Sequence, residues 1–460
     1  MTIIKRLRAF FAICACRFVR RVLRILGKGG TSLPGMVAVK LYRGVLSVLS
    51  ENVNTIIVTG TNGKTTSSRM IEQTLIESGR TYFCNKSGAN MLGGIVAEFC
   101  ENSTVTGKKK YDWALIECDE AAFRTVSRYI NAKCVLVTNV FRDQLDRYGE
   151  VTHTISSITE GIRNSQNAVV CLNADCSLTV SIADKIDNKI IYYGVDKAIY
   201  KHRVEEVSDA PYCIKCKSKY EYSYRTFGHL GGFYCTNCGY HRPKCEVSVT
   251  DIISTDESSS KVVLRIGNSS FDVKINLPGG YNIYNATGAA CVGYALGFDS
   301  KTDVRALESF ECGFGRMEML PINDAQLRMI LVKNPAGCNQ VLNFLMNSQE
   351  PSLFIVALND NYADGTDVSW IWDVDFEKLT AVSDLLREIW VTGIRADEMA
   401  MRFKYAGIEV GKIKVIKDYT ELIDRISREK GNVYMMPTYT AMLSIRKKIA
   451  DRFGFKEFWK

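Results

Sequence analysis

IIVTGTNGKTT, residues 56–66, is the stretch that decides the fold. An apolar, β-branched run ends in a turn bounded by Gly60 and Gly63, and helical periodicity continues over residues 67–78. A strand, a glycine-rich loop and a helix N-terminus together direct backbone N–H groups and the positive end of the helix dipole toward a polyphosphate. The stretch therefore predicts a phosphate-binding loop.

Two residues of this loop have specific expected roles. Lys64 is placed to reach the outer phosphates of a nucleotide, and the Thr65 hydroxyl to bind Mg²⁺. The spacing is G-x-x-G-K-T, which is shorter than the general form G-x-x-x-x-G-K-[ST]. The alternative is a surface turn rich in glycine and threonine. If the loop binds nucleotide, the cofactor-binding residues are Gly60, Thr61, Asn62, Gly63, Lys64, Thr65 and Thr66.

Length and charge narrow the class of protein. The 460 residues correspond to about three domains of roughly 150 residues each. Residues 1–50 contain ten Lys or Arg and no Asp or Glu, so almost all of the net charge of +9 lies there. The remaining residues, with 49 basic and 50 acidic side chains, sum to −1. A nearly neutral body argues against a general nucleic-acid surface.

The basic start of the chain predicts an amphipathic helix. Arg17, Arg20, Arg21 and Arg24 crowd beside its apolar face, and the longest uncharged run, residues 9–16, is too short to cross a bilayer. Two interpretations stay open: a helix in an anionic membrane interface, or one packed on the protein body with a solvated basic flank. Residues 27–35 predict a linker. The apolar face comprises Ile3, Leu7, Phe10, Cys14, Phe18, Val22 and Ile25.

Four of the sixteen cysteines form a pattern typical of a metal site. Cys213-x-x-Cys216 and Cys235-x-x-Cys238 are separated by 18 residues, the spacing of a tetrahedral Cys₄ zinc ribbon. Four protein ligands leave no open position, so the zinc is expected to be structural. Redox dithiols or unpaired core cysteines are the alternatives. Most of the other cysteines sit singly in apolar runs, and no convincing signal peptide precedes them, so we expect a reducing cytoplasm.

The order of elements predicts an α/β protein. Strand-like runs at 55–59, 113–117, 134–138 and 168–172 alternate with helical or loop stretches, which indicates a mainly parallel sheet covered by helices. The composition changes to Cys, Tyr, Gly and Lys around 210–245, then returns to β-rich alternation over 261–277 and a helix over 284–296. A second α/β series has strands near 328–332, 353–357, 388–392 and 432–435.

Further segments in this order resemble the Mur ligase family. They are ALIE at 114–117, TNV at 138–140 with DQLD at 143–146, LNAD at 172–175, LPG at 277–279, NIYNA at 282–286, GRME at 315–318 and KNP at 333–335. The resemblance implies that Glu117 binds Mg²⁺, that Asn282 and Asn285 lie near adenine and ribose, and that Arg316 helps to hold the phosphates. Taken singly, each residue also fits a turn or cap, and Gln144 replaces a usual His.

The resemblance implies a fold and three segments. Residues 1–52 would form the basic amphipathic helix and linker, and residues 53–320 a Mur-ligase-like central P-loop ATPase domain with a Cys₄ zinc-ribbon insertion at about 210–245. Residues 321–460 would form a Rossmann-like α/β C-terminal domain. Only about 52 residues precede the first strand of the nucleotide site, too few for the domain with which ordinary Mur ligases bind a UDP-sugar precursor.

The chain is most similar to the MurT branch of that family, through its basic start, TSLPG at 31–35, the ribbon and NDNYADGTDVSWIWD at 359–373. This resemblance implies ATP- and Mg²⁺-dependent amidation of the D-glutamate α-carboxylate in the stem peptide of lipid II, with ammonia from a GatD-like glutaminase in a heterodimer. Asp367, followed by Asp364 and Asp360, is the candidate to orient the partner's catalytic His. A solvated acidic loop is the alternative.

Two other functions remain open. A self-sufficient amino-acid ligase of the Mur or folylpolyglutamate type would attach an amino acid and need no glutaminase. A non-enzymatic zinc-ribbon protein that binds nucleic acid would need basic residues interleaved with exposed aromatics on the ribbon. The neutral body and the nucleotide-site series favour the amidating ligase. We expect a cytoplasmic protein and leave open a peripheral position at the inner face of the membrane. The aromatic candidates are Tyr220, Tyr222, Tyr224, Phe227 and Phe233, beside Arg225.

Overall fold

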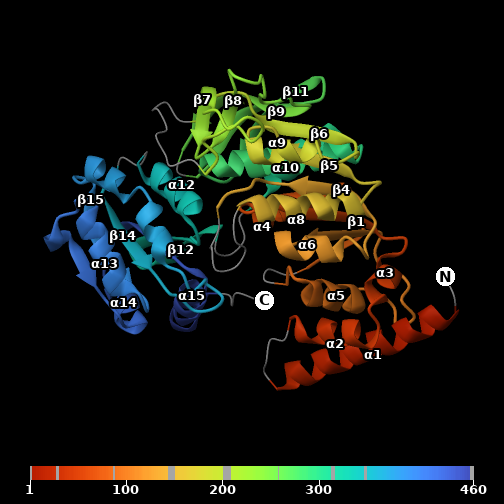
Figure 1. Ribbon diagram of the computed structural model, residues 1–460. Helices are drawn as coiled ribbons and strands as arrows, with labels where there is room; N and C mark the ends of the chain where they lie inside the picture. The colour runs from red at the N-terminus through yellow and green to blue at the C-terminus, as the bar shows by residue number, and fades with distance from the viewer. Residues whose placement is uncertain are drawn as a thin grey trace.

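A computed structural model describes residues 3–26, 31–85, 89–142, 151–199, 209–256, 258–311, 316–346 and 350–455 (Figure 1). The largest sheet has nine strands in the order β11-β10-β9-β6-β5-β4-β1-β3-β2. Its seven strands from β2 to β9 pair in parallel, and β10 and β11 extend it antiparallel. The strands are β1 (Asn54–Thr59), β2 (Tyr82–Cys84), β3 (Trp113–Glu117), β4 (Ala132–Val137), β5 (Val169–Asn173), β6 (Ile190–Val195), β9 (Val247–Thr255), β10 (Ser260–Ile266) and β11 (Ser269–Ile275).

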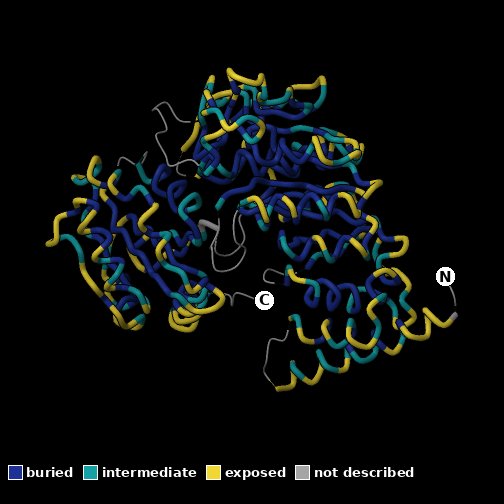
Figure 2. Tube along the Cα trace, in the orientation of Figure 1, coloured by how far each residue is buried: buried dark blue, intermediate teal, exposed yellow. Residues whose placement is uncertain are grey.

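Helices cover both faces of this sheet, as its almost wholly buried central strands require (Figures 1 and 2). One group packs around α4, and the helices of the other group follow β2, β3, β4 and β5 on the opposite face. The first group is α4 (Lys64–Glu77), α10 (Gly280–Ala295) and α11 (Ser300–Ser309); the second is α5 (Leu92–Glu101), α6 (Glu120–Val126), α8 (Val151–Asn164) and α9 (Ser177–Ala183).

Three helices precede the sheet: α1 (Ile3–Ile25), α2 (Leu33–Leu41) and α3 (Val45–Ser50). The predicted linker is therefore shorter than 27–35, because Pro34 occupies the first turn of α2, where proline is well tolerated. The α2 and α5 backbones cross so closely that a Cβ on Gly35 would lie 1.8 Å from the Gly93 carbonyl oxygen. Within the described residues, no helix is long and apolar enough to cross a membrane.

The second sheet has six strands in the order β12-β13-β17-β14-β15-β16, all parallel except β12. Helices lie on its two faces, which matches the α/β series expected for this part of the chain (Figure 1). The strands are β12 (Arg316–Ile322), β13 (Ala325–Ile330), β14 (Ser352–Ala357), β15 (Leu386–Thr392), β16 (Ile413–Val415) and β17 (Gly431–Pro437). The helices are α12 (Pro335–Leu345), α13 (Ala396–Tyr405), α14 (Tyr419–Ile426) and α15 (Tyr439–Phe453), with short 3₁₀ turns η1 (Ser369–Asp373), η2 (Phe376–Val382) and η3 (Val410–Lys412).

Between β6 and β9 the chain forms the cysteine-rich insertion. A two-stranded antiparallel hairpin, β7 (Glu221–Phe227) and β8 (Leu230–Tyr234), accompanies the four cysteines. The α/β class and the eight predicted strand positions are confirmed, apart from shifts of up to a few residues at their ends.

A buried carboxylate, Asp303 of α11, lies where α11 packs against α10. It is fully buried against Gly293, and neither of its carboxylate oxygens has a hydrogen-bond partner among the described residues. Burial, with a smaller contribution from Asp299, raises its pKa from 3.8 to about 8. The folded state therefore retains a proton that the unfolded chain has already released, and stability is lost as the pH rises from about 4 to about 8, by up to about 1.4 kcal/mol per pH unit.

We expect Asp303→Asn to be more stable than the natural chain near pH 8, because the carboxamide does not ionise. The difference should shrink toward pH 4. Thermal unfolding of both proteins at about pH 5 and about pH 8 measures this effect. The same pH dependence in both would contradict the assignment of the effect to Asp303.

Candidate nucleotide and metal sites

The predicted nucleotide-site residues meet at one edge of the nine-stranded sheet. Strands β4, β1 and β3 are parallel neighbours, so their carboxyl ends lie side by side. The phosphate loop follows β1, Glu117 ends β3, and Asn139 follows β4. This edge is where open α/β sheets place their ligands.

The phosphate loop has the backbone that its glycines predict. Gly60 and Gly63 have φ values of 119° and 85°, in the region that favours glycine. A Cβ on Gly63 would lie 2.1 Å from Oδ1 of Asn285 in α10, so no larger residue fits. Helix α4 begins at Lys64, which places its N-terminal N–H groups and dipole at the loop. The surface-turn alternative does not account for this buried cradle.

The Lys64 ammonium group is held inside the loop. Its Nζ donates to the carbonyl oxygens of Gly60, at 2.5 Å, and Thr61, at 3.2 Å. It also forms an ion pair with Glu120 Oε1 at 3.2 Å, and both side chains are buried. Because a low dielectric strengthens charge interactions, this cation is well placed to stabilise negative charge that arrives at the loop.

Three asparagines connect the loop to its surroundings. The Asn62 N–H donates to Asn139 Oδ1 at 3.0 Å, and Asn139 Nδ2 donates back to the Asn62 carbonyl at 3.1 Å. Asn334 Nδ2 donates to Asn62 Oδ1 at 3.1 Å, and Asn334 is also the N-cap of α12. The loop is therefore bonded directly to the first helix of the C-terminal α/β unit.

The two candidate magnesium ligands share one small pocket. Thr65 and Glu117 line it together with Ser68, Asn85 and other residues. Asn85 fixes the end of β3, because its side chain accepts from the Glu117 N–H and donates to the Glu117 carbonyl, both at 2.8 Å. Hydroxyl and carboxylate oxygens are ligands that Mg²⁺ prefers, so the arrangement fits this ion.

Of the remaining candidate nucleotide-binding residues, the structure describes some and not others. Asn285 packs against the phosphate loop, where its Oδ1 accepts from Ser67 Oγ at 3.3 Å. Asn282 accepts from Asn285 Nδ2 at 3.1 Å and donates to the Pro278 carbonyl at 2.7 Å. The side chain of Arg316 and the DQLD segment at 143–146 lie outside the described residues.

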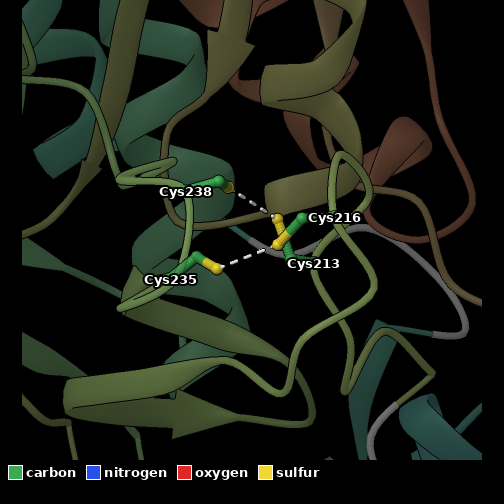
Figure 3. A group of neighbouring side chains, drawn as sticks. All are labelled: Cys213, Cys216, Cys235 and Cys238. Atoms are coloured by element: carbon green, nitrogen blue, oxygen red, sulfur yellow. Dashed lines mark hydrogen bonds between the residues drawn. The ribbon is translucent and has the colours of Figure 1, made fainter.

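The four predicted zinc ligands converge, as Figure 3 shows. Their sulfur atoms all lie within 4.8 Å of one another, and the Cys213–Cys238 and Cys216–Cys235 pairs are 3.5 and 3.4 Å apart. A tetrahedral zinc site with Zn–S bonds of about 2.3 Å places its sulfurs about 3.8 Å apart. The geometry therefore fits a Cys₄ zinc ion.

A buried charge network fastens the insertion to the large sheet. Arg242 donates to Asp175 Oδ1 at 2.6 Å and to Asp196 Oδ1 at 2.8 Å. Burial raises the pKa of Asp175, and Arg242 opposes that rise. Tyr284 of α10 also donates to Asp175, so the network reaches the helix that supports the phosphate loop.

The tip of the β7–β8 hairpin packs beside the phosphate loop. The Phe227 and His229 rings lie 5.9 and 4.5 Å from the Phe141 ring, and the Phe141 N–H donates to Thr61 Oγ1 at 3.1 Å. Burial lowers the pKa of His229 to about 3, so this side chain is neutral at physiological pH. Tyr220 and Phe233 are buried as well, and Tyr222 and Tyr224 are only partly exposed. Three of the five aromatic candidates are therefore unavailable for stacking on bases.

The three candidate aspartates after β14 differ in their surroundings. Asp360 accepts from Arg395 Nε at 2.7 Å. Asp364 is buried and accepts from the Thr440 N–H and hydroxyl at the start of α15. Asp367 is half-buried, and within the described chain its carboxylate accepts only from the Ser369 N–H, at 2.8 Å. Asp367 therefore has the most capacity for a further donor.

Sequence reasoning missed Glu120 and Arg242. Glu120 belongs to the acidic run Glu117-Cys118-Asp119-Glu120 that begins at the last residue of β3, a signal that was available from the sequence. Arg242 carries no local signal, because its partners Asp175 and Asp196 lie far away in the chain. Only the fold brings them together.

Comparisons with known proteins agree with this arrangement. A family model described as Mur ligase middle domain matches residues 58–238, and one described as MurT ligase C-terminal matches residues 331–442. The relative named lipid II isoglutaminyl synthase (glutamine-hydrolyzing) subunit MurT from Streptococcus pneumoniae (strain ATCC BAA-255 / R6) is 34% identical over 449 residues, 97% of this chain and 98% of the relative. The relative of the same name from Staphylococcus aureus (strain N315) is 33% identical over 448 residues, 97% of this chain and 99% of the relative.

A solved structure is similar in fold. The MurF ligase from Thermotoga maritima, in complex with ADP, matches with a TM-score of 0.62 and 15% identity, over 90% of this chain and 85% of that chain.

Proposed function

Because this chain belongs to the MurT family and is a ligase with the Mur ligase fold, we propose that it is the synthetase subunit of a lipid II isoglutaminyl synthase. In this function it uses ATP and Mg²⁺ to amidate the D-glutamate α-carboxylate of the lipid II stem peptide. The observation that carries the proposal is the phosphate loop, with buried Lys64 inside it and Thr65 and Glu117 lining one adjacent pocket.

The chemistry requires activation of the carboxylate. Direct attack by ammonia would have to expel an oxide, which is a poor leaving group. Transfer of the γ-phosphoryl group from ATP to the carboxylate oxygen gives an acyl phosphate and ADP, and ammonia then displaces inorganic phosphate to form the amide. Lys64 and Mg²⁺ at Thr65 and Glu117 would stabilise charge on the transferred group, and Arg316 is the further candidate.

A separate glutaminase is expected to supply the ammonia, because free ammonia in solution is almost wholly protonated to non-nucleophilic ammonium near neutral pH. The sequence contains only four histidines and no cysteine in a G-x-C-x-G nucleophile elbow. His229 is buried beside Cys176, with Nε2 3.3 Å from its sulfur, and is enclosed by Phe141. Glutamine therefore cannot reach the buried side chains of Cys176 and His229. A GatD-like partner with its own Cys and His fits the chain, with Asp367 as the candidate to orient that His.

The proposed function is tested by supplying the purified chain with ATP, Mg²⁺, lipid II and either ammonium chloride or glutamine. Mass spectrometry reports whether the D-glutamate has become an amide. We expect amidation with ammonium but not with glutamine, and glutamine use once the glutaminase is added. If the complex is also inert with both donors, the amidation proposal is wrong, and the self-sufficient amino-acid ligase becomes the better interpretation.

We also propose that the four cysteines hold a structural zinc ion. Elemental analysis of the purified chain should find about one zinc per chain, since the four thiolates complete the coordination shell. Cys216→Ser combined with Cys235→Ser should lose the metal, whereas Cys14→Ser, in α1, should retain it. A chain that folds without zinc, or a double variant that keeps its zinc, would refute this site.

A further inference from the structure

Helix α1 packs on the protein mainly through small side chains, with Ile13 as the large exception, and leaves six large apolar side chains exposed. Ala9, Ala12, Ile13 and Cys16 are buried. These buried side chains pack against α2, α3 and α5. Six large apolar side chains have exposures between 37% and 84%: Ile4, Leu7, Phe11, Phe18, Val22 and Ile25.

These six side chains form one narrow stripe. At 100° per residue, all six positions fall within about 60° of one another, and the buried positions lie on the opposite side of the helix. The stripe runs along most of a helix about 35 Å long. Helix α1 lies at the outer edge of the molecule, away from the second sheet (Figures 1 and 2). The two interpretations of this helix were therefore not exclusive, since it packs with one face and exposes the other.

The charges on α1 indicate what covers the stripe. Lys5, Arg6, Arg8, Arg21 and Arg24 are exposed, and residues 3–26 contain no acidic side chain. At 100° per residue, Arg8 and Arg21 flank the stripe on its two sides, and the other three cations lie farther round the helix. The other two arginines of α1 bond to α5 and to the residues that follow it. Arg17 donates to the Cys100 and Ser103 carbonyls, and Arg20 pairs with Glu98 at 2.9 Å. The exposed cations are thus available for an anionic surface.

We propose that α1 binds the surface of an anionic membrane, with the stripe at the boundary of the acyl chains and the arginines at the phosphate groups. Burial of the large apolar side chains supplies the main driving force, and the basic residues add electrostatic attraction. A second copy of the chain would complement this face poorly, because it would bring like charges together. The inference rests on α1 alone and does not require the proposed amidation.

The test uses the full chain and vesicles without lipid II, so its result is independent of catalysis. Sedimentation measures partition onto vesicles of phosphatidylglycerol mixed with phosphatidylcholine, and onto phosphatidylcholine alone. The stripe variant carries Leu7→Gln, Phe11→Gln and Phe18→Gln. A matched control carries Ile253→Gln, Ile394→Gln and Val410→Gln, three apolar residues of similar exposure elsewhere on the surface.

We expect the natural chain and the control to bind the anionic vesicles, and the stripe variant to bind at least about 100-fold more weakly. Arg8→Gln, Arg21→Gln and Arg24→Gln together should weaken binding by about 5-fold per arginine and remove the preference for anionic lipid. Equal binding by the stripe variant and the control, or no binding by the natural chain, would overturn the proposal. A dimer lost in the stripe variant, without vesicle binding, would assign the face to a second copy instead.

Discussion

Replacing Lys64 with alanine is expected to lower ATP-dependent amidation by about 1000-fold, the effect of removing one preorganised charge donor from a phosphoryl-transfer site. The ammonium group lies inside the phosphate loop, where it contacts Gly60, Thr61 and Glu120. Initial rates with ammonium chloride as the nitrogen donor measure the effect without the glutaminase step.

This substitution also removes the ion pair between Lys64 and the buried Glu120, so the stability of the variant must be measured as well as its activity. Lys64→Ala combined with Glu120→Gln also removes the buried carboxylate charge, and should recover stability but not activity. Lys197→Ala is the matched control, because Lys197 pairs with Asp251 in an exposed position and should be dispensable. A Lys64→Ala enzyme with more than about a tenth of the natural rate would contradict the assigned role.

Replacing Asp367 with asparagine is expected to abolish glutamine-dependent amidation, by about 1000-fold or more, and to leave ammonium-dependent amidation intact. An aspartate that orients a catalytic His affects only the reaction of that His, and its loss is costly because the imidazole takes the wrong tautomer. The carboxylate of Asp367 accepts one hydrogen bond within the described chain, from Ser369, so its replacement should not unfold the loop. Parallel assays of the heterodimer with the two nitrogen donors separate the two reactions.

The neighbouring aspartates provide internal controls. Asp364→Asn should lower the unfolding temperature and both activities together, because Asp364 supports the start of α15. Asp360→Asn breaks a half-exposed pair with Arg395 and should change stability by less than about 1 kcal/mol. Selective loss of glutamine use in one of these variants, rather than in Asp367→Asn, would move the role to that residue.

The parts of the site that sequence predicts well are those set by local chemistry. The phosphate loop needs glycine at fixed positions, so Gly63 and Lys64 could be placed in advance. Glu117 was added by the resemblance to the Mur ligase family. The CxxC spacing likewise predicted that four sulfurs would converge. These signals depend on short-range geometry that a few residues determine.

The parts that could not be predicted depend on long-range packing. The periodicity of α1 allows two faces, one with large side chains and one with mostly small ones. Only the packing of α2, α3 and α5 decides that the face with mostly small side chains is buried. The raised pKa of Asp303 depends on its enclosure against Gly293 in another helix. Nothing near Asp303 in sequence indicates that enclosure.

The bond between Asn334 and Asn62 has a consequence for how the two α/β units influence each other. Asn62 belongs to the phosphate loop, and Asn334 caps α12, the first helix of the second unit. A nucleotide that binds more tightly when this hydrogen bond is formed would favour the orientation of α12 in which the bond can form. Thermodynamic linkage makes the coupling reciprocal, so any protein that fixes this orientation alters nucleotide affinity by the same factor. A partner bound at the second unit thus needs no contact with the phosphate loop to change how tightly ATP is held.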